Sequence, residues 1–85
     1  MYYLYIVECV DKSLYTGIAK DLTKRILEHN ESPKGAKYTK NKRPVKLVYY
    51  MSFQNRSDAT KEEIRVKKLS RNEKLSLIKS FIFDL

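Results

Sequence analysis

Residues 2–10, Tyr-Tyr-Leu-Tyr-Ile-Val-Glu-Cys-Val, are the stretch that decides the fold. Aromatic and β-branched residues dominate it, and its nearly continuous apolar character is typical of a central strand buried on both faces. A turn at Asp11-Lys12-Ser13 is followed by a second stretch of β character at residues 14–18, Leu-Tyr-Thr-Gly-Ile. Together these segments predict a β-hairpin, in which Gly17 allows a bulge or a close backbone approach.

A helix and a third strand are expected after the hairpin. Asp21 is a candidate N-cap, because its carboxylate can accept hydrogen bonds from the free amides of a first helical turn. The helix would cover about residues 22–30, where apolar side chains recur at helical spacing. Residues 46–53, Lys-Leu-Val-Tyr-Tyr-Met-Ser-Phe, have the composition of a strand.

The last third of the chain predicts two helices. The first would span Asp58 to Lys68, with cap residues supplied by positions 54–57. Ser70 and Glu73 match a capping box that opens a helix to about residue 79. The order β-β-α-β-α-α therefore predicts an α+β fold, a small three-stranded antiparallel sheet flanked by helices.

The chain length of 85 residues is enough for one domain, 1–85, with one modest core. Residues 80–85 form an apolar C-terminal tail that either docks on the core or frays. The single cysteine excludes an internal disulfide, and one cysteine with one histidine cannot complete a zinc site. No apolar run is long enough for a membrane helix and no signal peptide is visible, so we expect a cytoplasmic protein with no membrane partner.

The net charge is strongly positive, with 18 Lys and Arg against 10 Asp and Glu, a formal charge of +8. Such an excess in a small domain points to a polyanionic partner, and basic side chains that neutralise phosphates give salt-sensitive binding. The plainer interpretation is a solubilising surface. The basic residues fall into three groups, which are Lys20, Lys24 and Arg25; Lys34, Lys37, Lys40, Lys42 and Arg43; and Arg65, Lys67, Lys68 and Arg71.

One carboxylate has an unusual place in the pattern of the second predicted helix. Ala59, Glu63 and Val66 follow i, i+4, i+7 spacing and so share one face, whereas Glu62 points elsewhere. A carboxylate on a partly apolar face is unfavourable unless it is paired or binds a cation. Spacing alone leaves both an ion pair and a metal site open for Glu63.

An ordered set of motifs adds to these observations. Tyr3-Leu4-Tyr5 and Tyr15-Thr16-Gly17, followed by Arg25, His29 and Glu63, resemble the GIY-YIG nuclease superfamily, in which the tripeptides Gly-Ile-Tyr and Tyr-Ile-Gly lie on neighbouring strands. The resemblance covers residues 2–74. Within the superfamily, the chain is similar to the small stand-alone bacterial branch, which resembles the catalytic subunit of branched-DNA endonucleases. Further matches include Glu28-His29-Asn30, Gly35-Ala36-Lys37-Tyr38-Thr39 and Arg43-Pro44-Val45.

The resemblance implies a catalytic site made of Tyr5, Tyr15, Arg25 and His29. One tyrosine would act as general base on a water and the other would order the water network. A phenol has a reference pKa near 10, so the basic role demands a depressed pKa. Arg25 would clamp the phosphate, and His29 would position water or phosphate. Glu63 would hold a single Mg²⁺ or Mn²⁺ ion.

The function that these features predict is a metal-dependent endonuclease that hydrolyses DNA, with branched or damaged DNA as candidate substrate. The alternatives are a nucleic-acid-binding module whose cleavage is weak or needs a protein partner, and a basic RNA-binding protein without a site. A monomer is favoured.

Many members of the superfamily carry an Asn about a dozen residues after the Glu, where this chain has Leu75. The residues expected to contact nucleic acid are Lys24, Lys34, Lys37, Tyr38, Lys40, Lys42, Arg43 and Lys67.

Overall fold

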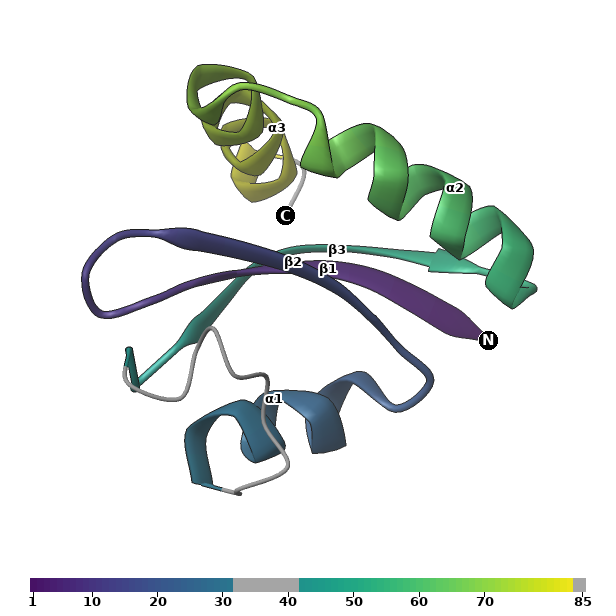
Figure 1. Cartoon of the computed structure of the whole chain (residues 1–85), viewed down its shortest axis with the longest axis horizontal. Coiled ribbons are helices and arrows are strands. Elements are labelled where there is room, and N and C mark those ends of the chain that lie inside the picture. Colours follow the sequence, from purple (N-terminus) through teal and green to yellow (C-terminus); the bar gives the residue numbers. More distant parts are fainter. Residues whose placement is uncertain (32–41, 84–85) are drawn as a thin grey trace.

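The computed structural model describes residues 1–31 and 42–83, and in this part of the chain the six elements follow the expected order (Figure 1). Two antiparallel strands, one helix, a third strand and two helices succeed one another, which confirms the α+β architecture. The elements are β1 (Tyr2–Glu8), β2 (Leu14–Ala19), α1 (Leu22–Glu31), β3 (Lys46–Phe53), α2 (Arg56–Lys67) and α3 (Arg71–Phe83).

The sheet has the order β2-β1-β3, with both pairings antiparallel, so β1 is the central strand as its apolar run predicts. β1 ends at Glu8 rather than at residue 10, because Cys9 and Lys12 take part in the turn. The Cys9 amide donates to the Ser13 carbonyl at 2.8 Å and the Lys12 amide to the Cys9 carbonyl at 2.9 Å. The pairing is irregular between Ile6 and Val7, opposite β3, and not at Gly17.

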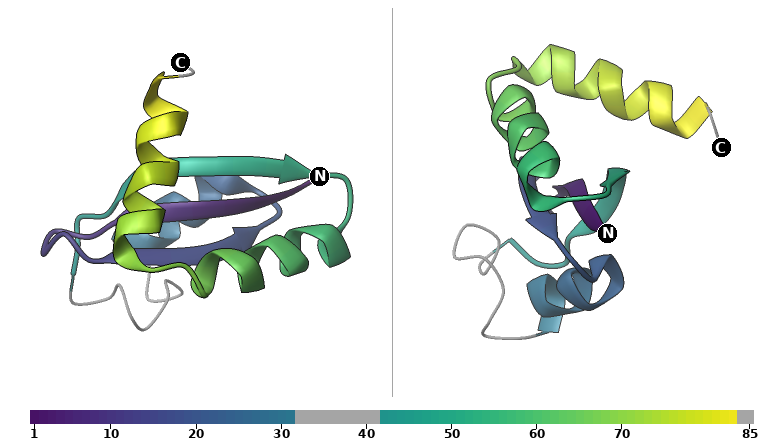
Figure 2. Two further views of the ribbon diagram at one scale, coloured as in Figure 1. Left: turned by 90° about the horizontal axis from the view of Figure 1, so that it is seen from above. Right: turned by 90° about the vertical axis from the view of Figure 1, so that its right-hand side faces the viewer.

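The helices form two layers around the sheet, with α1 on one face and α2 and α3 on the other (Figures 1 and 2). Successive side chains of β1 point to opposite faces. Leu4 and Ile6 pack into a cluster with residues of α2 and α3, whereas Tyr5 and Val7 pack into a cluster on the α1 side. Burial on both faces explains why the strand lacks a polar alternation.

Local hydrogen bonds start two of the helices where the sequence predicts them. Asp21 Oδ1 accepts from the Lys24 amide at 3.0 Å, which confirms the N-cap of α1. Ser70 and Glu73 cap each other's backbone, with distances of 3.2 Å from the Glu73 amide to Ser70 Oγ and 3.0 Å from the Ser70 amide to Glu73 Oε1. This reciprocal pair confirms the capping box of α3.

The two helices of the second layer differ from their expected bounds. α2 begins two residues earlier than predicted, at Arg56, because Asn55 Oδ1 accepts from the Asp58 amide at 2.9 Å and acts as the cap. α3 continues past residue 79 to Phe83. Phe81 accounts for this, since its ring packs edge-on against Tyr49 and Tyr50 at centroid distances of 5.4 and 5.2 Å. The first part of the apolar tail therefore docks on the core.

Over the described residues, no helix has both the length and the apolar character needed to cross a membrane.

Candidate active site

The two tyrosines of the motifs lie on neighbouring strands, on the sheet face that α1 covers. Tyr5 is opposite Gly17 in the register and Tyr15 is opposite Val7, so the two rings are diagonal neighbours. Their centroids are 6.4 Å apart and their planes are inclined by 47°. The structure thus brings together two phenols that are ten positions apart in sequence.

Gly17 leaves room for the ring of Tyr5. A Cβ atom at position 17 would lie 2.6 Å from Tyr5 Oη, 2.8 Å from Tyr5 Cζ and 3.2 Å from Tyr15 Cε2. The first two distances are shorter than a carbon contact tolerates. The close backbone approach expected at Gly17 is therefore present, and it lets the phenol of Tyr5 lie across β2.

His29 projects from α1 onto the tyrosine pair and is fully buried. Its Nε2 atom lies 2.7 Å from Tyr5 Oη, a hydrogen bond between residues 24 positions apart. The imidazole centroid is 5.7 Å from that of Tyr5 and 5.3 Å from that of Tyr15, with both pairs inclined by 65°. The three rings form one contacting cluster, so His29 supports the tyrosines rather than lying on the surface.

Arg25 lies one helical turn before His29 on the same side of α1, which places its guanidinium beside Tyr5. Arg25 Nη1 donates to Glu28 Oε1 at 3.1 Å, and its side chain also hydrogen-bonds to Tyr5. A guanidinium only donates, so the Tyr5 oxygen is the acceptor in the second bond. The direction of the bond to His29 depends on the imidazole tautomer: when the ring proton is on Nδ1, Nε2 accepts from the Tyr5 hydroxyl, and donation then runs from Arg25 through Tyr5 to His29.

Burial shifts the pKa values of this cluster in opposite directions. Burial raises the pKa of Tyr5 to about 12, with smaller contributions from Tyr15 and Glu63, although the Arg25 hydrogen bond and charge oppose the rise. Burial lowers the pKa of His29 to about 4, and the charge of Arg25 adds to this effect. At neutral pH the phenol of Tyr5 is protonated and the imidazole of His29 is neutral. The depressed pKa expected of a direct base is therefore absent from Tyr5 in the free protein.

Glu63 and Glu62 point to different sides of α2. Ala59 and Val66, which share the helical face of Glu63, are fully buried, and the Glu63 carboxylate is close enough to raise the pKa of Tyr5. The Glu62 carboxylate instead acts on Tyr49, on the opposite face of the sheet. The two carboxylates thus lie on different flanks of α2, Glu62 toward Tyr49 and Glu63 toward Tyr5, and both are mostly buried, at 17% and 21% exposed.

The Glu63 carboxylate has a cationic neighbour, because Lys67 Nζ lies 3.0 Å from Glu63 Oε2 across one helical turn. The Glu63 side chain is 21% exposed, and that of Lys67 is 53% exposed. The described residues contain no group of three or more His, Cys, Asp and Glu side chains able to hold a metal ion. A lone, partly exposed carboxylate with hard oxygen donors suits only an ion that keeps most of its waters, as Mg²⁺ does.

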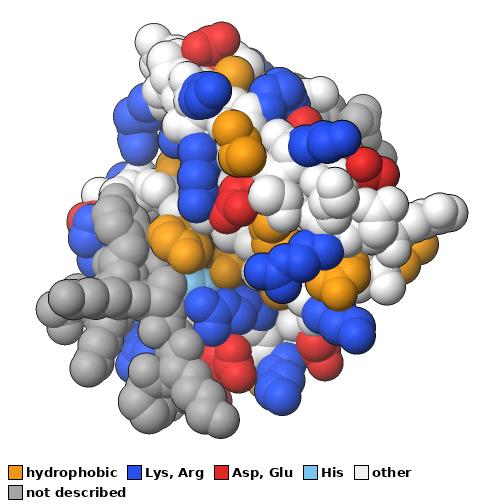
Figure 3. All heavy atoms as spheres, turned by 45° about the vertical axis from the view of Figure 1, so that its right-hand side comes forward, with side chains coloured by type: hydrophobic (Ala, Val, Ile, Leu, Met, Phe, Trp, Pro, Cys, Tyr) orange, Lys and Arg blue, Asp and Glu red, His pale blue; other side chains and the backbone are white. Residues whose placement is uncertain are grey.

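The basic residues expected to bind nucleic acid have different surroundings. Lys24 is exposed on α1, and Lys and Arg side chains are spread over the molecular face seen in Figure 3. Lys42 Nζ lies 3.4 Å from Asp11 Oδ2. Arg43 donates to two carbonyls at the end of α1, from Nε to His29 and from Nη2 to Glu28, the latter at 3.4 Å. Lys34, Lys37, Tyr38 and Lys40 lie outside the described residues.

Asn30 is a supporting residue that the sequence reasoning missed. Its Oδ1 accepts from the Val45 amide at 2.7 Å and its Nδ2 donates to the Val45 carbonyl at 3.2 Å. This two-bond clamp ties the end of α1, next to His29, to the start of β3. The signal was present in Glu28-His29-Asn30 and Arg43-Pro44-Val45, two matches with no role attached.

Comparison with known proteins agrees with this geometry. Residues 1–76 match the GIY-YIG catalytic domain. The UPF0213 protein SSP2268 of Staphylococcus saprophyticus is 56% identical over 77 residues, covering 91% of this chain and 93% of the relative. Two solution NMR structures are similar, the UPF0213 protein BH0048 of Bacillus halodurans (44% identity, TM-score 0.60, covering 93% of this chain and 84% of that one) and EF2693 of E. faecalis (40% identity, TM-score 0.64, covering 96% and 86%). The chain therefore belongs to the GIY-YIG nuclease family, among the small bacterial UPF0213 proteins.

Proposed function

We propose that this protein is a metal-dependent endonuclease that hydrolyses DNA phosphodiester bonds, with branched or damaged DNA as the candidate substrate. The observation that carries the proposal is the 2.7 Å contact between Tyr5 Oη and His29 Nε2, beside the guanidinium of Arg25. A buried phenol that donates to a neutral imidazole and accepts from a cation is arranged for proton transfer. A buried tyrosine with a purely structural role also needs a partner for its hydroxyl, but one partner is enough, whereas a cation and an imidazole both meet the oxygen of Tyr5.

The proton path in this proposal uses both residues. As a water attacks phosphorus, its proton passes to the Tyr5 oxygen while Tyr5 gives its own proton to His29 Nε2. The new bond joins the water oxygen to phosphorus, and the bond to the leaving oxygen breaks. With the pKa of His29 at about 4, charging the imidazole costs about 4 kcal/mol at pH 7, and a bound phosphate lowers that cost. Tyr5 therefore relays the proton and does not have to exist as a free phenolate.

Arg25 and Tyr15 complete the proposed chemistry. The guanidinium of Arg25 supplies an always-ionised donor fork for the phosphate, and Glu28 holds it in place. The phenol of Tyr15, in contact with the Tyr5 and His29 rings, would order the attacking water.

Glu63 would hold one Mg²⁺ or Mn²⁺, with waters and substrate phosphate as the other ligands. When bound, the ion supplies Lewis-acid stabilisation of the phosphate and the leaving oxygen. Lys67 now neutralises this carboxylate. If Glu63 held the ion, the Lys67 ammonium could contact a phosphate instead, so the expected metal ligand and an expected nucleic-acid contact are neighbours on α2.

The experiment that tests the function is incubation of labelled branched and linear DNA with the protein in Mg²⁺, and separately in EDTA. We expect cleavage products in the Mg²⁺ incubation and none in the EDTA incubation. Glu63→Gln keeps the side-chain shape and should abolish cleavage, whereas binding in EDTA is retained. Glu62→Gln is the matched control, since Glu62 contacts Arg65 at 2.6 Å and acts on Tyr49.

Three outcomes oppose the proposal. If the Glu63→Gln protein still cleaves DNA in Mg²⁺, or if the Glu62→Gln protein does not, Glu63 is not the metal ligand. Binding of DNA without cleavage on any substrate would favour the alternative, a nucleic-acid-binding module that needs a protein partner to cut. If Glu63 serves only as the ion-pair partner of Lys67, its replacement changes the melting temperature and leaves cleavage intact.

A further inference from the structure

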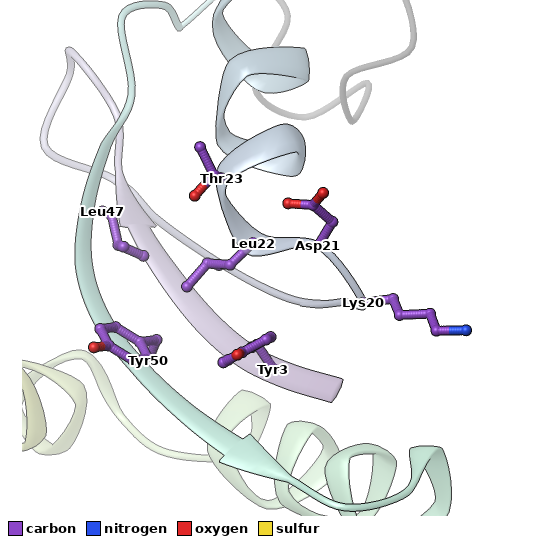
Figure 4. Close-up of a pocket in the computed structure, with 7 residues that line it drawn as sticks. All are labelled: Tyr3, Lys20, Asp21, Leu22, Thr23, Leu47 and Tyr50. Atoms are coloured by element: carbon purple, nitrogen blue, oxygen red, sulfur yellow. The ribbon is translucent and has the colours of Figure 1, made fainter. Parts of the chain in front are cut away.

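A hollow lies on the same sheet face as Tyr5, on the side toward β3. In the register, the row through Tyr5 runs from Gly17 on β2 to Tyr50 on β3, and the row through Tyr3 runs from Ala19 to Ser52. The small neighbours of Tyr3 leave space beside its ring. This aromatic hollow measures about 530 Å³ and is open to solvent (Figure 4), and it is lined by Tyr3, Lys20, Asp21, Leu22, Thr23, Leu47 and Tyr50.

Two tyrosine rings form a corner of the aromatic hollow. The centroids of Tyr3 and Tyr50 are 6.3 Å apart and their planes are inclined by 65°. Tyr50 lies on an edge strand, and its side chain is 41% exposed. The ring of Phe81 packs against Tyr50 at 5.2 Å. The exposed ring is therefore already held in place, so a planar ligand that stacks on it immobilises little that is free.

Basic side chains lie between the candidate active site and the aromatic hollow. A smaller hollow of about 250 Å³ is lined by Lys24, Arg25 and Glu28 and shares Lys20 and Asp21 with the aromatic hollow. Lys20 extends outward from the rim in Figure 4. A nucleic-acid backbone clamped at Arg25 would thus meet two ammonium groups on its way to the rings.

Asp21 indicates which part of a nucleotide enters. Its carboxylate, which caps α1 through the Lys24 amide, lies at the junction of the two hollows. A carboxylate repels a phosphate but accepts a hydrogen bond from the amino group of a base. Aromatic and aliphatic walls around one acid favour a base over a phosphate.

We propose that the aromatic hollow binds one unpaired nucleobase of the DNA substrate, next to the phosphate that is cleaved. This inference rests on the proposed function and specifies its substrate as DNA with a single-stranded segment. A base in a duplex has its faces covered by its neighbours, so only an unstacked base can present a face to Tyr50.

The sequence marks Tyr3 as a departure that fits this role. Tyr3-Leu4-Tyr5 stands where Gly-Ile-Tyr is usual in the superfamily, so Tyr3 replaces a residue that has no side chain. A glycine at position 3 would remove one wall of the aromatic hollow. The base site is therefore a property of chains that carry an aromatic residue here.

The test is fluorescence anisotropy in EDTA with a labelled duplex that carries a short single-stranded overhang on either strand, compared with the blunt duplex. We expect the wild-type protein to prefer the overhang. Tyr50→Ala and Tyr3→Ala should weaken overhang binding by about 5- to 100-fold, the scale of one base stacked on an aromatic ring. Tyr50→Phe keeps the ring and should keep the affinity. Met51→Ala is the matched control, because Met51 follows Tyr50 on β3, is equally exposed at 41% and points to the opposite face.

Each outcome is decisive once melting curves show that the variants fold. No overhang preference in the wild type, an unchanged preference in Tyr50→Ala, or an equal loss on overhang and blunt DNA overturns the base site. An equal loss would assign the rings to the packing of the sheet edge. A ring-dependent overhang preference without cleavage in Mg²⁺ would support the base site and contradict the proposed endonuclease. If Tyr50→Ala leaves cleavage in Mg²⁺ and overhang binding unchanged, the endonuclease is supported and the base site is contradicted.

Discussion

Gly17 and Tyr5 are register partners on β2 and β1, and the phenol of Tyr5 lies across the space that a side chain at position 17 would occupy. The motif glycine thus serves packing rather than a turn, since it has no positive φ angle. The same phenol bonds to His29 on its other side. Position 17 therefore controls the place of the atom that carries the proposed proton transfer.

Gly17→Ala should separate activity from stability. The added methyl group forces the Tyr5 ring away from β2, and we expect the cleavage rate to fall by about 10² or more because positioning and proton transfer are both lost. Overpacking of this kind costs about 1–3 kcal/mol in the free energy of unfolding. Cleavage assays and urea denaturation measure the two effects.

Ile18→Val is the control for that loss of stability. Ile18 is the next residue on β2, so it points to the other face. It is half-buried, and its truncation costs about 0.5 kcal/mol, the low end of the range for buried isoleucines. Cleavage below the unfolding temperature should be retained. A Gly17→Ala protein as active as Ile18→Val would show that the position of Tyr5 is not critical.

Arg25→Lys keeps the charge beside Tyr5 but loses the planar donor fork. We expect cleavage to fall by about 10² to 10³, the scale of one positioned donor to a transition-state charge. DNA affinity in EDTA should hardly change, because one positive charge remains. Single-turnover rates and anisotropy give the two values, and an equal loss of both would reduce Arg25 to a surface phosphate contact.

His29 should make the folded protein sensitive to mild acid. Burial lowers its pKa from 6.5 to about 4, so between these pH values the unfolded chain binds a proton that the folded protein does not. Stability is then fully present above pH 6.5 and decreases toward pH 4, by up to about 3 kcal/mol. Urea midpoints measured between pH 6.5 and 4.5 should show this decrease.

His29→Gln removes the titration and still offers Tyr5 a hydrogen-bond partner. Its urea midpoint should vary less over the same pH range. Carboxylates with lowered pKa values, such as Asp11 and Glu62, lose their stabilising effect at lower pH and are present in both proteins. Parallel pH profiles for the two proteins would show that His29 is not held neutral by burial.

Arg43→Gln tests whether Arg43 binds phosphate or holds α1. Since Arg43 donates to the carbonyls of His29 and Glu28, we expect lower stability by about 1–2 kcal/mol and slower cleavage. The salt dependence of DNA binding should stay the same. Lys24→Ala is the comparison, because an exposed lysine on phosphate contributes about 0.9 to the slope of log K against log salt. If Arg43→Gln reduces the slope of log K against log salt by a similar amount, Arg43 is a phosphate contact.

Much of the fold follows from local patterns in the sequence. The apolar run of β1 predicts a central strand because burial on both faces removes polar alternation. The bounds of β3 agree with its composition, and the caps at Asp21 and at Ser70 with Glu73 depend on bonds that span three residues. The residues of the candidate active site could be named from the ordered motifs, and the i, i+4, i+7 spacing separated Glu63 from Glu62.

Only the tertiary structure decided how these residues act. The bond between Tyr5 and His29 joins β1 to α1, and both pKa shifts arise from burial by elements distant in sequence. Arg43 is indistinguishable from the other cations in a basic stretch until the end of α1 packs beside it. The extension of α3 depends likewise on contacts of Phe81 with β3. Sequence patterns encode what lies within a few residues, whereas desolvation and non-local hydrogen bonds exist only once the chain is packed.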